Sequence, residues 1–92
     1  MKTLRIVTVC GMGFGTSLML LMEIQDLAKK YNVNVVGEAT DLGSYKGKEC
    51  DLIVASSQIA SQIDENEKDV VSIENMLDRE EIENKMLKYF KE

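Results

Sequence analysis

A cysteine followed by a glycine-rich segment is the feature of this sequence best suited to chemistry. Glycine permits backbone conformations that other residues avoid, and successive peptide N–H groups can then turn inward as a nest for an anion. A helix that starts in such a segment adds N–H groups without intrahelical partners and the positive end of its dipole. We therefore predict a phosphate-binding loop, with two hydroxyl donors at its end, made of Cys10, Gly11, Met12, Gly13, Phe14, Gly15, Thr16 and Ser17.

The thiol of Cys10 stands at the entrance of this predicted loop. The N–H groups and the helix end favour a thiolate, so the thiol pKa is expected below its free value of about 8.5. A thiolate is a good nucleophile toward phosphorus, and phosphoryl transfer depends mainly on positioning and electrostatic stabilisation. Cys10 is therefore predicted to accept a phosphoryl group, with no cofactor and no metal. A cysteine at a strand end is often only a small apolar residue, as we expect of Cys50, but the glycines favour the nucleophile at Cys10.

Residues that the loop lacks restrict its chemistry further. It contains no lysine, so it does not match a nucleotide P-loop, and Thr16 stands where a dinucleotide motif has its third glycine. Gly13 stands where a redox C-x-x-C pair needs its second cysteine. Thr16 also stands where a cysteine-dependent phosphatase has the arginine that clamps the phosphate. A carrier that shields the phosphoryl group from water fits best. A phosphatase or arsenate reductase and a non-catalytic anion-binding domain remain alternatives.

Composition narrows the class of protein. The chain has 92 residues, which predicts one domain spanning 1–92, and its net charge of −5 argues against nucleic acid and anionic membrane surfaces as partners. No apolar run approaches the roughly 20 residues of a membrane span, and no signal peptide is recognisable. Two cysteines favour a reducing cytoplasm over a disulfide-stapled secreted domain. The absence of histidine excludes phosphohistidine chemistry on this chain. We expect a cytoplasmic monomer that is not embedded in the membrane.

The hydrophobic pattern predicts alternating strands and helices. Strands are expected at 4–9, 33–39, 52–55 and 70–73, and a loop at 41–48. A helix is expected from Thr16, closed by Asn32, with a buried stripe at Leu20, Ile24, Leu27, Ala28 and Tyr31. Met19 and Met22 on this helix belong either to the core or to a partner contact. A short helix is expected at 58–63 with Ser57 as its N-cap.

The last predicted helix starts with a capping box, with Asp78 as N-cap and Glu81 at the third position, and its buried stripe is Ile82, Met86, Tyr89 and Phe90. Strands interleaved with helices predict an α/β fold, namely a four-stranded parallel sheet of order 2-1-3-4 with helices on both faces, as in Rossmann-like or flavodoxin-like domains. Ligands of such sheets bind where the strand order reverses, here between the first and third strands. The predicted loop and the segment Ser56, Ser57 and Gln58 would meet there.

The strand–Cys10-Gly11-x-Gly13-x-Gly15-Thr16-Ser17–helix pattern resembles the IIB component of the bacterial phosphoenolpyruvate-dependent sugar phosphotransferase system. The ascorbate type is the more similar branch, and the galactitol type is next. The resemblance extends along most of the chain in the family's order, through Tyr45-Lys46, Asp51-Leu52-Ile53-Val54-Ala55-Ser56, Ile59-Ala60, Val70-Val71 and Asn75-Met76-Leu77. Tyr45 and Lys46 are expected in an exposed loop.

The resemblance implies a protein-N-phosphohistidine–sugar phosphotransferase. A IIA protein donates a phosphoryl group from a phosphohistidine, Cys10 accepts it as phosphocysteine, and the group passes to a sugar, ascorbate-like by resemblance, bound in the membrane-embedded IIC transporter. The family match assigns Cys10 as the phosphorylated residue and Gly11 to Ser17 as its anion cradle. The absence of histidine fits, because the IIA protein and the general phosphocarrier each need one.

Overall fold

Strands and helices alternate along the chain in a computed structural model, which describes residues 2–9, 14–63, 68–75 and 77–91. All the predicted elements are present, and the strands extend one or two residues beyond their predicted ends. In chain order the elements are β1 (Lys2–Val9), α1 (Phe14–Lys29), β2 (Val33–Thr40), β3 (Leu52–Ser56), α2 (Ser57–Ala60), β4 (Asp69–Ile73) and α3 (Arg79–Lys91).

The strands that the structure describes form one parallel sheet of order β2-β1-β3-β4, which confirms the predicted fold class and strand order. β1 is an inner strand. Its last residue, Val9, pairs with Thr40 of β2 on one side and with Ala55 of β3 on the other. The carboxyl ends of these strands therefore lie level along one edge of the sheet.

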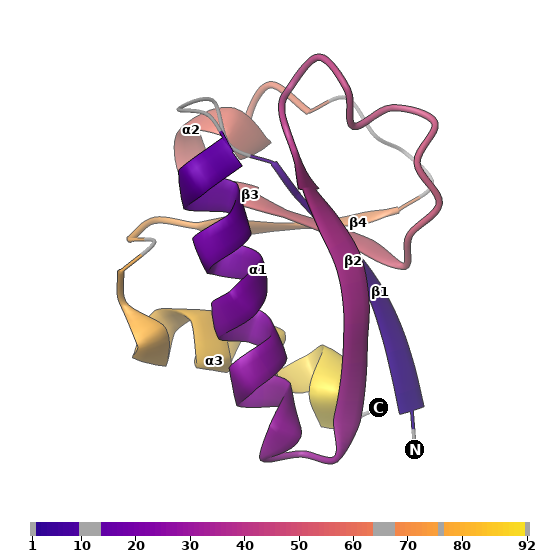
Figure 1. The fold of residues 1–92 in the computed structure, drawn as a ribbon. Helices are drawn as coiled ribbons and strands as arrows, with labels where there is room; N and C mark the ends of the chain where they lie inside the picture. The colour runs from indigo at the N-terminus through magenta and orange to yellow at the C-terminus, as the bar shows by residue number, and fades with distance from the viewer. Residues whose placement is uncertain (1, 10–13, 64–67, 76, 92) are drawn as a thin grey trace.

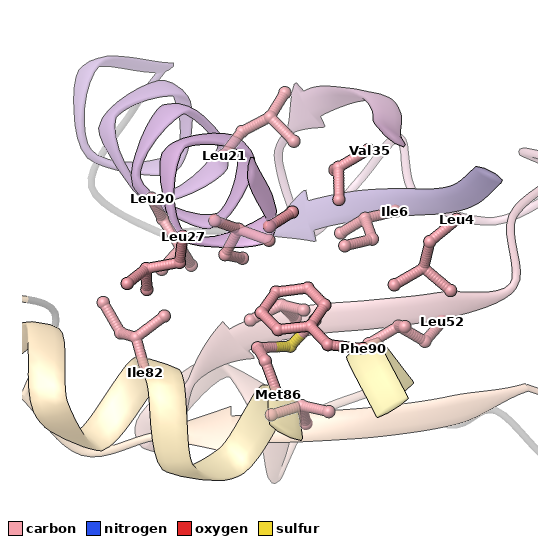
Figure 2. Packing of buried hydrophobic residues seen from close by; sticks show 14 of the residues in the cluster. Leu4, Ile6, Leu20, Leu21, Leu27, Val35, Leu52, Ile82, Met86 and Phe90 are labelled. Carbon is pink, nitrogen blue, oxygen red and sulfur yellow. The ribbon is translucent and has the colours of Figure 1, made fainter. Parts of the chain in front are cut away.

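One face of the sheet is covered by α1 and α3. Figure 1 shows α1 lying across the sheet, and Figure 2 shows the side chains of both helices meeting those of the strands. Leu20, Ile24 and Leu27 are at most 2% exposed, as the helical spacing predicts. Each such side chain contributes about 1.5–3 kcal/mol relative to an exposed position. The main core is completed by strand residues and by Ile82, Met86 and Phe90 of α3.

The end of α1 also follows the prediction. Asn32 has a φ of 56°, the left-handed conformation that commonly ends a helix, and asparagine tolerates it better than most residues. Tyr31, just before it, stacks on Phe90 with ring centroids 5.3 Å apart. None of the helices within the described residues is both long enough and apolar enough to cross a membrane.

The opposite face has a smaller core and thinner cover. Val7, Val9 and Ile53 point to this face because side chains alternate along a strand. They are covered by the 41–50 connection and by α2, so helices do lie on both faces, although α2 is only four residues long. Tyr45 was predicted to be exposed, and this was wrong, since it is only 4% exposed. Its ring supplies apolar area that the short helix lacks. Cys50 is half-buried against the same cluster, in a structural setting.

Two predicted helix starts need correction. Asp78 caps α3 as predicted, because its Oδ1 accepts from the N–H groups of Glu80 and Glu81 at 3.1 and 3.2 Å. The Glu81 carboxylate does not reach back to Asp78, whose N–H donates to the Asn75 carbonyl instead. Ser57 was predicted as the N-cap of the second helix but is the first residue of α2. Ser56 occupies the cap position, without a capping hydrogen bond from its side chain.

The Glu81 carboxylate instead binds the segment that follows β4. It accepts from the N–H groups of Glu74 and Asn75 at 2.6 and 2.9 Å, and from Lys85 Nζ at 2.8 Å. The Lys85 ammonium, followed by the two N–H groups, lowers the pKa of Glu81 from 4.5 to about 2. One side chain thus holds together the end of β4 and the first turn of α3.

The first prediction concerns the close approach of β1 and β2 at Gly37. A Cβ added to Gly37 would lie 1.7 Å from the Ile6 carbonyl oxygen, which belongs to backbone and cannot move aside. We expect Gly37→Ala to lower the free energy of unfolding by about 3 kcal/mol, measured by urea denaturation. Gly43→Ala is the matched control, because its Cβ would meet only Asp41 Oδ1 at 3.6 Å. Equal stability of the two variants would contradict the prediction.

The second prediction concerns pH. Because the pKa of Glu81 is lower in the folded chain, its contribution to stability is complete above about 4.5 and is lost as pH falls toward about 2. We expect Glu81→Gln to be less stable than the wild type at neutral pH, with the difference shrinking over that interval. Urea midpoints measured from pH 2 to pH 7 test this. Glu80→Gln, an exposed neighbour in the same turn, should keep the wild-type pH dependence. A constant gap between Glu81→Gln and the wild type would contradict the assignment.

Candidate anion-binding site

The predicted phosphate-binding loop connects the buried end of β1 to the start of α1. Its residues Cys10, Gly11, Met12 and Gly13 lie outside the described residues, so their predicted roles stay predictions. The structure describes both ends of the connection. Val9 is fully buried, and the chain order of the sheet reverses at β1, because β2 and β3 lie on its two sides. This is the edge at which parallel α/β sheets bind their ligands.

The other end of the loop is the first turn of α1. The helix begins at Phe14, two residues earlier than predicted, so Gly15, Thr16 and Ser17 all lie in its first turn. Gly15 is exposed, Thr16 is half-buried and Ser17 is fully buried. A Cβ at Gly15 would meet nothing within 4 Å. The first N–H groups of a helix have no intrahelical acceptors, so those of Phe14, Gly15 and Thr16 are the donors that an anion could use.

The electrostatic setting of this turn favours an anion. The first turn of α1 contains no acidic residue, and no charged residue occurs from position 10 to position 22. The helix dipole is therefore not opposed by a carboxylate of its own first turn. The hydrogen-bonding groups of the loop are neutral peptide N–H groups and hydroxyls. A phosphate here would be held by aligned dipoles, with no arginine or lysine from the loop.

A buried hydrogen bond joins β1 to this same turn. Thr8 Oγ1 donates to the carbonyl oxygen of Ser17 at 2.8 Å, and both residues are fully buried. The sequence reading missed Thr8. The signal was present, because Thr8 alternates with Leu4 and Ile6, so a hydroxyl stands on the strand face that packs under α1.

Polar residues follow β3 at the same edge. Ala55 pairs with Val9, and Ser56, Ser57 and Gln58 come directly after it. Ser56 and Ser57 are half-buried, and Gln58 is exposed. The predicted convergence of this segment with the end of β1 is thus present at the level of the strands. Among the described residues there is no group of three or more cysteine, aspartate or glutamate side chains that could hold a metal ion.

The outer face of α1 bears exposed apolar side chains close to the loop. Leu18, Met19 and Met22 are 49%, 61% and 58% exposed. Met19 and Met22 are therefore not part of the core, which was one of the two alternatives for them. The two methionines form an exposed apolar surface with Leu18, which fits the alternative of a partner contact for Met19 and Met22. The oligomeric state itself stays a prediction. Met19 and Met22 also line a surface hollow with Glu23, Gln25, Asp26 and Lys29.

An ion-pair cluster borders this surface and joins α1 to α3. The Arg79 guanidinium pairs with Asp26, and its Nε lies 3.4 Å from Glu23 Oε1. The hydrogen bond from Arg79 holds the pKa of the Asp26 carboxyl below its ordinary value and raises that of the guanidinium. The cluster fixes α3 against the middle of α1, so the apolar surface lies on a supported helix.

Together, the sheet order and the ligand edge at β1 define an open parallel α/β domain. Comparison with known proteins is more specific. The family described as "PTS system, Lactose/Cellobiose specific IIB subunit" matches residues 5–88. The "Ascorbate-specific PTS system EIIB component" of Mycoplasma pneumoniae is 31% identical over 90 residues, 95% of each chain. Proteins of the same name from Shigella dysenteriae and Escherichia coli O157:H7 are each 33% identical over 93 residues, 98% of this chain and 92% of theirs.

The chain therefore belongs to the PTS IIB family, and it is a IIB component of a sugar phosphotransferase system. The match spans nearly the whole length of these relatives, so it covers the strand and helix that flank the predicted loop as well as the later elements. This confirms the resemblance inferred from the Cys10 motif.

Proposed function

We propose that this chain is a cytoplasmic phosphoryl carrier in which Cys10 receives a phosphoryl group from the phosphohistidine of a IIA protein. Cys10 then transfers the group to a sugar bound by the membrane IIC subunit. The observation that supports this most strongly is the position of the loop. The chain belongs to the IIB family, and its one cysteine in a glycine-rich segment directly follows β1, an inner strand of the sheet. The same segment leads into the first turn of α1, which contains no acidic residue.

The two transfers balance without a cofactor. In the first, the Cys10 thiolate attacks phosphorus, the S–P bond forms and the P–N bond breaks, with its electron pair going to the imidazole of the donor. In the second, a sugar hydroxyl attacks phosphorus and loses its proton to a base of the acceptor complex. The O–P bond forms and the S–P bond breaks, with its electron pair returning to the Cys10 thiolate. The transition state of phosphoryl transfer spreads charge over the equatorial oxygens. The N–H groups of 14–16 and the Thr16 hydroxyl are the proposed donors to these oxygens, together with Gly11, Met12 and Gly13, and the role of Ser17 in this cradle stays a prediction.

An ascorbate-like sugar is the proposed substrate of the complete system. The family description refers to lactose and cellobiose, whereas the relatives that match along nearly their full length are named for ascorbate. The relatives that match at 31–33% identity are a more specific guide to the sugar than the family description, so their name is the basis for this proposal. A phosphatase is less well supported, since Thr16 occupies the position of its arginine and the charge clamp for hydrolysis is missing.

The third prediction tests the phosphorylated residue. Incubation of the chain with its phosphorylated IIA donor should add one phosphate to the intact mass, as read by mass spectrometry. Cys10→Ser should abolish this addition, because a neutral hydroxyl at this position is a far weaker nucleophile than a thiolate. Cys50→Ser is the matched control and should be labelled like the wild type. Labelling of both variants would reject Cys10, and sustained hydrolysis of a phosphate ester by the isolated chain would favour the phosphatase.

The fourth prediction assigns the IIA donor to the exposed apolar face of α1. The donor must bring its phosphohistidine to Cys10 and so must cover the surface around the start of α1. Met19 lies five residues beyond Phe14, about 8 Å along the helix axis. Exposed methionines at this distance are suited to the apolar centre of an interface.

The variant Met19→Gln/Met22→Gln should raise the donor concentration needed for half-maximal labelling about tenfold, with unchanged thermal stability. Val36→Gln is the matched control, since Val36 is 41% exposed but adjoins the buried Val35 on β2 and so points to the opposite face of the sheet. If labelling by the donor is unchanged and only transfer to the sugar slows, the surface belongs to the acceptor instead.

A further inference from the structure

Thr8 is a polar residue in an otherwise apolar part of the core. Thr8 is fully buried, with 0% of its surface accessible. It lies on the same face of β1 as Leu4 and Ile6, which pack beneath α1. Valine has the same shape and would be buried there without desolvating a hydroxyl. The hydroxyl donates to the Ser17 carbonyl at 2.8 Å. It therefore serves a contact with α1, and not one within the sheet.

The two partners of this bond flank the predicted loop. Thr8 is the residue before the last one of β1, and Ser17 is the fourth residue of α1. The bond therefore closes a ring that contains residues 9–16. A carbonyl oxygen has two lone pairs, so Ser17 can accept from Thr8 while it also accepts from a helix N–H group. The bond adds a constraint between strand and helix without removing one from the helix.

We propose that Thr8 is a positioning residue for phosphoryl transfer: its hydroxyl fixes the first turn of α1 relative to the end of β1. The first N–H groups of α1 are thereby held in one direction relative to the end of β1, the point from which the chain continues into the predicted phosphate-binding loop. This inference rests on the proposed function of Cys10. Thr8 itself lies in the core and acts through the helix.

The apolar contacts of α1 do not by themselves fix the direction of its first turn. Leu20, Ile24 and Leu27 lie one to three turns further along the helix and hold its middle against the sheet. Apolar contacts are not directional, so they allow small rotations and shifts of the first turn. A hydrogen bond is directional and is strengthened by burial. Displacements of about 1 Å in a site that works by positioning reduce rates by up to about a hundredfold, so a constraint on this turn has a functional consequence.

The test uses the full chain with Cys50→Ser, so that Cys10 is the only thiol. Thr8→Val keeps the shape and removes the hydroxyl, Thr8→Ala does so with a smaller side chain, and Thr8→Ser keeps the hydroxyl. Ile6→Val is the matched control, because it trims a buried residue on the same face of β1 without touching the bond. Two quantities are measured for each folded variant: the pKa of the Cys10 thiol, from the pH dependence of alkylation by iodoacetamide, and the initial rate of labelling by phosphorylated IIA.

We expect Thr8→Val and Thr8→Ala to raise the thiol pKa toward the free value of about 8.5 and to slow labelling by about tenfold or more. Thr8→Ser should restore both quantities, and Ile6→Val should lower stability but leave both near the wild type. Wild-type thiol pKa and labelling rate in a folded Thr8→Val or Thr8→Ala variant would overturn the proposal, as would equal effects of Ile6→Val. Alkylation needs no phosphoryl donor, so the thiol pKa tests the role of Thr8 independently of labelling. If the chain with an unchanged Thr8 is not labelled by phosphorylated IIA, that result counts against the proposed function alone.

Discussion

The inner position of β1 is the constraint on which the rest of the structure depends. β1 is hydrogen-bonded to β2 along one edge and to β3 along the other, and its residues Ile6 to Val9 are at most 2% exposed. A strand enclosed in this way can present a reactive group only where the chain leaves the sheet. That point is also where the strand order reverses, so helices on the two sides diverge and leave the edge accessible. A residue that directly follows Val9 in the sequence, as Cys10 does, is therefore predicted to lie at this edge.

The two faces of the sheet serve this edge unequally. The face under α1 and α3 contains most of the large buried side chains, and polar interactions between the two helices add to it at the middle of α1 and just after its end. Arg79 links α3 to α1, and Glu83 accepts from Tyr31 at 2.6 Å and pairs with Lys30 at the far end of α1. The Tyr31 hydrogen bond lowers the pKa of Glu83, so this tie is ionic at neutral pH. α1 is thus held along its length, as a helix must be if its first turn is to present N–H groups in a fixed direction.

Hydrophobic periodicity was sufficient to predict the element order, the sheet order and the buried stripe of α1, because each depends on short-range spacing and on general rules of connection. The failures involve contacts between distant segments. Tyr45 is buried because a four-residue α2 leaves part of the sheet bare, which no local pattern reveals. Glu81 has the spacing of a capping box, yet it binds the N–H groups of Glu74 and Asn75, while the N–H of Asp78 donates to the Asn75 carbonyl.

The candidate site also has a part that local sequence predicts and a part that depends on contacts between distant residues. Its composition and its place at the end of the first strand could be predicted from the Cys10 motif and the strand order. The alternation of Thr8 with Leu4 and Ile6 indicates a hydroxyl on the buried face of the strand, but its partner, the carbonyl of Ser17 nine positions away, could not be predicted from local spacing. The roles of Cys10 and the glycines that follow it stay predictions, because those residues lie outside the part of the chain that the structure describes.

Charge explains why geometry matters so much for the proposed carrier. The chain has a net charge of −5 and no charged residue from position 10 to position 22, so a phosphate dianion would add to an acidic molecule and meet no cation of the loop. Its stabilisation must come from neutral N–H and hydroxyl dipoles, whose interaction with a charge falls off within about one helix turn and depends on direction. An arginine fork tolerates displacement better, because the attraction between full charges is longer-ranged than that of dipoles. A loop without arginine therefore depends on its two ends being held in register, which the pairing of β1 and the packing of α1 provide.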